Sequence, residues 1–140
     1  MSLRGRCNCG NIQLVWQTVD YSVVPRACQC AYCRVCNANY VSKTGTGFQV
    51  TIRKASLHQI DQQGAGFAEF HSCVHCARLV FVSAEIGGDI YGAIESSCLQ
   101  NPMGFAQPVK VDPAALGVEE KQTRWQHNWC DRVSIRVQER

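Results

Sequence analysis

The sequence contains no long hydrophobic run. None of its apolar stretches approaches the roughly 20 residues that a membrane-spanning helix needs. The opening residues 1–7 also contain no apolar stretch of the kind found in signal peptides. We therefore expect a cytoplasmic protein with no membrane partner. Because the cytosol keeps thiols reduced, disulfides would then be a poor explanation for the ten cysteines in the chain.

Charged residues are also scarce. They make up 18% of the chain, against 46% hydrophobic residues, which is typical of a globular protein and argues against disorder. The formal net charge is +3, and the basic residues are scattered along the chain. Seven cysteine thiolates around two Zn²⁺ ions would bring the net charge close to neutral. The charge pattern therefore predicts a solvated surface and argues against a nucleic-acid partner.

Internal repeats and low-complexity linkers are absent, and helical periodicity is weak. We therefore expect residues 1–140 to form a single, all-β domain of short antiparallel strands. Alternating or β-branched segments predict strands at 12–16, 49–52, 57–60, 67–70, 79–82 and 133–137. Turn signals separate them at 44–47, 64–66 and 87–89. The segments 57–60 and 67–70 predict a hairpin, and residues 112–116 predict one short turn of helix.

Eight of the ten cysteines lie in three tight clusters, at residues 5–10, 28–36 and 73–76. A C-x-C or C-x-x-C pair supplies two ligands from one turn, and two such pairs complete the four-ligand shell of a zinc ion. The alternatives are an iron–sulfur cluster at 28–36 and ordinary buried thiols. Eight cysteines at ligand spacing favour zinc. Cys98 and Cys130 stand alone, and for them the core or surface thiol is the better interpretation.

These three clusters, in this order, resemble the glutathione-dependent formaldehyde-activating enzyme family, which also contains centromere protein V. The family pattern is G-x-C-x-C-G, then C-x-C-x-x-C-R, then C-x-x-C-G. Residues 5–10 match the first motif, residues 28–34 match the second, and Cys73 and Cys76 match the third. The resemblance covers residues 4 to about 100. Ala77 stands where the pattern has a glycine, and residues 107–127 have no counterpart.

The resemblance implies an all-β fold of the β-tent type, stapled by zinc, with two Zn²⁺ ions per chain. It implies a structural zinc site and a second zinc site that keeps an open position. The first would use Cys7, Cys9, Cys73 and Cys76, and the second would use Cys28, Cys30 and Cys33.

An open zinc position suits the binding of a thiol. The resemblance implies a carbon–sulfur lyase that handles the adduct of a glutathione-type thiol with formaldehyde or another small carbonyl. No catalytic base can be assigned from the sequence; Glu69, His71 and Asp89 are only candidates, and a surface role is the more ordinary interpretation for each. His71 and His75 could also hydrogen-bond the thiolates of the third cluster.

Two other functions remain open. The first is a non-catalytic zinc module that binds a thiol or a protein partner, in which Cys36 closes the second site with a fourth sulfur. The second is a nucleic-acid or cytoskeleton binder, which the charge pattern disfavours. Residues 39–40 begin an extended segment, which would carry Cys36 away from the metal. We therefore expect Cys36 not to be a ligand.

Overall fold

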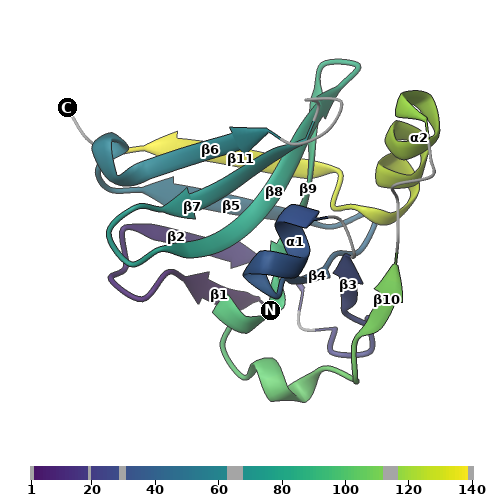
Figure 1. The fold of residues 1–140 in the computed structure, drawn as a ribbon, viewed down its shortest axis with the longest axis horizontal. Helices are drawn as coiled ribbons and strands as arrows, with labels where there is room; N and C mark the ends of the chain where they lie inside the picture. Colours follow the sequence, from purple (N-terminus) through teal and green to yellow (C-terminus); the bar gives the residue numbers. More distant parts are fainter. Residues whose placement is uncertain (1, 19, 29–30, 63–67, 112–116, 139–140) are drawn as a thin grey trace.

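The computed structural model describes residues 2–18, 20–28, 31–62, 68–111 and 117–138. Within these ranges the chain is mostly β, with two sheets, two α-helices and three single-turn 3₁₀ helices (Figure 1). The 3₁₀ helices are η1 (Ala55–Leu57), η2 (Ser96–Cys98) and η3 (Pro102–Gly104). None of the helices in these ranges is long and apolar enough to cross a membrane.

The smaller sheet has four strands in the order β1-β2-β5-β11. These are β1 (Leu3–Arg6), β2 (Ile12–Trp16), β5 (Gly47–Ile52) and β11 (Arg132–Val137). The first three pair in antiparallel fashion, and β11 joins β5 in parallel. Along β2, buried side chains alternate with more exposed ones, because successive side chains of a strand point to opposite faces. One face of this sheet therefore points into the core.

The larger sheet has seven strands in the order β10-β3-β4-β9-β8-β7-β6. They are β10 (Val109–Val111), β3 (Arg26–Cys28), β4 (Asn39–Val41), β9 (Asp89–Glu95), β8 (Arg78–Ile86), β7 (Glu69–Cys73) and β6 (His58–Gln62). The β8–β9 hairpin turns at Gly87 and Gly88, both with positive φ. Two such residues are what a tight hairpin turn of the primed type requires.

Two hydrophobic clusters pack against the larger sheet. The first cluster joins it to the smaller sheet, because it combines Trp16 and Phe48 of the small sheet with Phe81 and Ile94 of the large one. The second cluster contains Tyr40, Phe70, Val82 and Ala93 of the large sheet together with Cys33 and Trp129. The chain thus has two apolar layers, and the cysteine clusters divide between them.

Both α-helices lie beside the second cluster. Helix α1 (Ala31–Cys36) follows β3 and supplies the buried Cys33. Helix α2 (Val118–Asn128) is polar over most of its length and is anchored at its end by Trp125 and by Trp129, which follows it. The two indole rings stack with centroids 4.8 Å apart. Packing of this pair against the second cluster, and not an apolar face along the helix, attaches α2 to the sheet.

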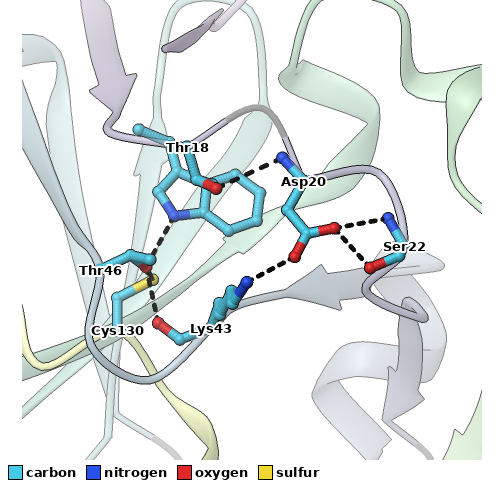
Figure 2. Close-up of polar contacts among 7 residues, drawn as sticks. Thr18, Asp20, Ser22, Lys43, Thr46 and Cys130 are labelled. Atoms are coloured by element: carbon cyan, nitrogen blue, oxygen red, sulfur yellow. Dashed lines mark hydrogen bonds and ion pairs between the residues drawn. The ribbon is translucent and has the colours of Figure 1, made fainter. Parts of the chain in front are cut away.

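The two loops that flank β3 and β4 are tied together by polar contacts (Figure 2). Lys43 Nζ lies 2.6 Å from Asp20 Oδ2, and Asp20 also accepts hydrogen bonds from Ser22. These contacts lower the pKa of Asp20 to about 2, with the Lys43 hydrogen bond as the main cause. Thr46 Oγ1 accepts from the Trp16 indole at 3.0 Å and lies 3.4 Å from Cys130 Sγ. These contacts therefore fix the loop that precedes β3, the strand that carries Cys28.

The mostly β architecture predicted from the sequence is confirmed, but the prediction that all strands are antiparallel is wrong. Strand β11 joins β5 and β10 joins β3 in parallel, because long connections return the chain to each sheet in the same direction. Predicted strands 12–16, 49–52, 79–82 and 133–137 fall within or on β2, β5, β8 and β11. The predicted hairpin forms as β6 and β7, with Ile60 opposite His71. Its 64–66 turn and the helical turn predicted at 112–116 lie outside the described residues. Helix α2 was missed, since its sequence shows only a thin apolar stripe.

Candidate metal centre

Four cysteines from two distant parts of the chain meet at one point of the fold. Cys7 and Cys9 lie in the tight loop between β1 and β2. Cys73 ends β7, and Cys76 lies in the turn that leads to β8. Their four Sγ atoms all lie within 4.8 Å of one another. We call this set the four-cysteine cluster. It connects a loop of the small sheet to a turn of the large one, and Figure 1 shows these two loops at the same end of the molecule.

The cluster has the donor set and spacing of a tetrahedral metal site. Cys7 Sγ lies 3.7 Å from Cys9 Sγ, and Cys9 Sγ lies 3.5 Å from Cys73 Sγ. Four sulfurs placed at the usual zinc–sulfur length around a tetrahedral ion are about 3.8 Å apart. A disulfide needs a separation near 2 Å, and the nine described cysteines form none. The residues therefore fit a thiolate-binding ion such as zinc.

The backbone on each side of the cluster adopts the left-handed turn that such a pair requires. Gly10 has a φ of +80°, and its N–H donates to Cys7 O at 3.1 Å. Ala77 has a φ of +52° in the equivalent place after Cys76. Glycine takes this conformation without the steric cost that a Cβ imposes. This explains the glycine of the third motif, and it means that Ala77 holds its turn under strain.

Backbone amides point at the sulfurs. Ile12 N–H donates to Cys7 Sγ at 3.3 Å. Burial raises the pKa of Cys7 and Cys73. Burial also raises the pKa of Cys76. Hydrogen bonds from the Cys9 backbone, from two neighbouring thiols and from the Asn8 backbone lower this pKa by more. The pKa of Cys76 is lowered to about 7. Hydrogen bonding within the cluster therefore stabilises negative charge on Cys76, whereas burial favours the neutral thiol at Cys7 and Cys73.

The middle cysteine segment, residues 28–36, lies on the other apolar layer. Cys28 ends β3 and is half-buried, whereas Cys33 on α1 is fully buried in the second cluster. Cys33 Sγ lies 3.2 Å from the hydroxyl of Tyr40. Cys30, which the resemblance assigns to the same site, lies outside the described residues. The structure therefore does not describe Cys28, Cys30 and Cys33 as a complete set, and the second zinc site stays a prediction.

Cys36 is exposed at the end of α1. Within the part of the chain that the structure describes, Cys28, Cys33 and Cys36 do not form a group with metal-binding separations. The chain enters β4 at Asn39, as the sequence predicts.

One buried carboxylate joins the two cysteine regions. Glu95 is only 5% exposed, and its Oε2 accepts from the backbone N–H of Asn39 at 3.0 Å, three residues after Cys36. Its Oε1 lies 3.7 Å from Arg78 Nη2, two residues after Cys76, and accepts from Ser97. Sequence reasoning missed Glu95, because nothing in its local sequence marks it as buried.

Of the two histidine candidates, His71 belongs to the core, and its ring nitrogens bond other side chains. His71 is buried, with Nδ1 2.9 Å from His58 Nε2 and Nε2 2.8 Å from Ser83 Oγ. Burial, with a smaller contribution from His58, lowers its pKa to about 3. With both nitrogens engaged, His71 is not placed to act as a catalytic base. His75 is exposed, Asp89 is exposed at the β8–β9 turn, and Glu69 begins β7.

The two lone cysteines lie in the core, as the sequence predicts. Cys98 is buried, and its thiol donates to the carbonyl of Val80 at 3.7 Å. Burial raises the pKa of both Cys98 and Cys130. These thiols therefore remain protonated and are not part of the four-cysteine cluster.

Comparison with known proteins identifies a shared fold. The chain matches no protein-family model, and none of the curated proteins matches it. Among solved structures it is similar to a Rhodobacter sphaeroides protein determined as a structural genomics target. The two superpose with a TM-score of 0.60 at 18% sequence identity, covering 77% of this chain and 99% of the other. At this identity the likeness extends to the fold, and the chemistry must be argued from the cysteines themselves.

Proposed function

We propose that the protein is a zinc-dependent enzyme of the glutathione-dependent formaldehyde-activating type, with a zinc-stapled β-tent fold. The observation that carries this proposal is the four-cysteine cluster: two short-spaced pairs, 64 residues apart from Cys9 to Cys73, meet at tetrahedral spacing. This is the set that the resemblance assigns to the structural zinc. The resemblance therefore supports carrying the second site over to Cys28, Cys30 and Cys33.

The two sites have different tasks in this proposal. The four-cysteine cluster has a complete set of four sulfurs, so it holds a structural ion and leaves no position for a substrate. The middle cysteine segment offers three cysteines to its ion and keeps one position open. A zinc ion held there would lower the pKa of an incoming thiol and stabilise its thiolate. Tyr40, beside Cys33, orients that thiol ligand through its hydroxyl.

The reaction is the addition of a thiol to a small carbonyl compound such as formaldehyde, or its reverse. In the forward direction a carbon–sulfur bond forms, the carbonyl π bond breaks, and the thiol proton ends on the new hydroxyl oxygen. The product is a hydroxymethyl thioether, and no oxidant or reductant is needed. A glutathione-type thiol is the proposed substrate.

The test measures zinc, binding and exchange on the same preparations. We expect two zinc ions per chain by elemental analysis, zinc-dependent glutathione binding by calorimetry, and faster exchange between formaldehyde and its glutathione adduct in ¹³C NMR. Cys28→Ser should keep one zinc and lose both glutathione binding and the acceleration. Cys36→Ser is the matched control and should keep all three properties. A two-zinc protein that neither binds glutathione nor accelerates exchange contradicts the enzyme.

A non-catalytic zinc module is the second candidate. The observation that favours it is that the ligand set assembled within the described residues, the four-cysteine cluster, is closed. This candidate predicts one or two tightly held zinc ions and four sulfurs around each ion in X-ray absorption spectra. The enzyme predicts an average below four, because one position of the second ion is taken by a lighter atom.

A further inference from the structure

One member of the four-cysteine cluster is open to solvent. Cys9 is exposed, whereas Cys7 and Cys73 are buried in the core. Cys76 is half-buried, and residues 74–75, in the turn that precedes it, are exposed. A sulfur that binds a metal does so as the thiolate, which is also the nucleophilic form of cysteine. A small oxidant in solution can therefore reach the cluster at Cys9 before it reaches the other sulfurs.

A second sulfur stands ready to react with Cys9. Cys9 Sγ lies 3.5 Å from Cys73 Sγ and 3.7 Å from Cys7 Sγ. A disulfide needs a separation near 2 Å, so a closure of about 1.5 Å joins Cys9 to Cys73. A disulfide between Cys7 and Cys9 would instead close a loop with one intervening residue, and loops this short are stiff. The geometry therefore favours Cys73 as the partner of Cys9.

Exposure alone does not distinguish Cys9. Cys36 is also exposed, at the end of α1. Within the described residues, however, Cys36 does not belong to a group with metal-binding separations, whereas Cys9 does. Cys9 therefore combines access to solvent with a cluster of neighbouring sulfurs.

We propose that Cys9 is a site of oxidation by hydroperoxides, and that Cys73 converts the oxidised Cys9 into a disulfide, which releases the metal ion of the four-cysteine cluster. This inference rests on the structural zinc of the proposed function. It requires neither the second zinc site nor the reaction with a carbonyl compound.

The chemistry takes two steps. In the first, the Cys9 thiolate attacks one oxygen of the peroxide; a sulfur–oxygen bond forms, the oxygen–oxygen bond breaks, and the other oxygen leaves as water after taking a proton. Sulfur is oxidised to a sulfenic acid and the peroxide is reduced. In the second, the Cys73 thiolate attacks Cys9 Sγ, the sulfur–sulfur bond forms, and the sulfenic oxygen leaves as a second water.

The disulfide would keep the two sheets joined after the ion has left. Cys9 lies in the loop between β1 and β2 of the small sheet, and Cys73 ends β7 of the large sheet. The two residues are 64 positions apart, so their disulfide closes a long loop and restrains the unfolded chain. Two of the four sulfurs are used up in this bond, and a tetrahedral thiolate site is no longer complete. Reduction of the disulfide restores the full set.

The test treats the zinc-loaded full chain with hydrogen peroxide. A chelating dye measures zinc release, and peptide mass spectrometry after alkylation of the remaining thiols locates the disulfide. We expect a Cys9–Cys73 disulfide, loss of one zinc ion for each disulfide formed, and trapping of the sulfenic acid on Cys9 by dimedone. Dithiothreitol followed by zinc should restore the starting state.

Two variants sharpen the test. Cys9→His keeps a zinc ligand at this position, because three cysteines and one histidine also form a structural zinc site, but it removes the oxidisable sulfur. This variant should bind zinc and lose the peroxide-induced release from the cluster. Cys36→Ser removes the other exposed cysteine and is the matched control, which should form the disulfide and release zinc as the wild type does. If Cys9→His does not fold, the disulfide map and the dimedone trap on the wild type decide the question.

The outcomes separate this inference from the proposed function. A chain that holds zinc in the cluster and shows neither the Cys9–Cys73 disulfide nor zinc release would overturn the inference and leave the proposed function standing. Equal zinc release from Cys9→His, or from a wild type whose disulfide excludes Cys9, would also overturn it. A peroxide-induced Cys9–Cys73 disulfide in a chain that binds no zinc would support the oxidation site and contradict the structural zinc of the proposed function.

Discussion

The four-cysteine cluster and the middle cysteine segment use the same residue type in different settings. The cluster is made by two tight turns, one on each sheet, whose backbone amides already point at sulfur. The middle segment runs from the end of a strand into a short helix and packs on the second hydrophobic cluster. The first arrangement places four sulfurs within metal-binding distance, whereas the second places its cysteines on a strand and a helix that pack against an apolar cluster. This difference suits a structural site and a reactive one.

The largest expected effect comes from removing a ligand of the four-cysteine cluster. Metal binding at such sites contributes on the order of 10 kcal/mol to folding, and here the ligands hold two sheets together. Cys7→Ser or Cys76→Ser should therefore give insoluble or unfolded protein, whereas Cys28→Ser should remain folded. Soluble yield and thermal unfolding measure this. If Cys7→Ser unfolds cooperatively at the wild-type temperature, the four-cysteine cluster does not stabilise the fold more than the middle segment does.

The connection between the regions is tested at Glu95. Glu95→Ala should lower the free energy of unfolding by about 3 kcal/mol, because it leaves Arg78 and the part-buried Asn39 N–H without their acceptor. Glu95→Gln should cost less, since an amide oxygen can still accept. Denaturation in urea measures both, with exposed Glu85→Ala as the control, expected within about 0.5 kcal/mol of wild type. An equal loss in the control would show that Glu95 has no special role.

Whether Cys36 belongs to the second zinc site is tested by replacing it. This residue is exposed, and among the described residues Cys28, Cys33 and Cys36 do not form a group with metal-binding separations. Cys36→Ser should therefore retain both zinc ions, and its stability should change by less than about 0.5 kcal/mol. Elemental analysis and thermal unfolding measure this. Loss of one zinc in Cys36→Ser would make the middle site a four-sulfur site and would favour the non-catalytic module.

The smallest expected effect is a gain at Ala77. Its φ of +52° strains an alanine, so Ala77→Gly should raise the free energy of unfolding by about 0.5–1 kcal/mol. The control is Ala106→Gly, at a position without positive φ, where added chain entropy in the unfolded state should destabilise slightly. Chemical denaturation measures both. A destabilised Ala77→Gly would mean that the turn is held by more than its backbone conformation.

Local sequence determined much of the molecule. The alternating pattern of Ile12, Leu14 and Trp16 predicts β2, and the Gly87-Gly88 pair predicts the turn between β8 and β9, because period-2 burial and positive φ are local requirements. The cysteine spacings predict thiolate pairs. Spacing alone left open which pairs meet; the resemblance implied Cys7 and Cys9 with Cys73 and Cys76, and the fold brings these four together.

Only the tertiary structure decided the rest. Helix α2 is polar, and it is held by the buried Trp129 and the partly buried Trp125, so its sequence carries little periodic signal. Glu95 is buried because its partners converge from β8, η2 and the entry to β4. Arg26 and Asn128 are far apart in sequence, and Ser42 links the Arg26 guanidinium to the backbone carbonyl of Asn128 at the end of α2. Such contacts depend on long-range packing, which no local pattern of residues encodes.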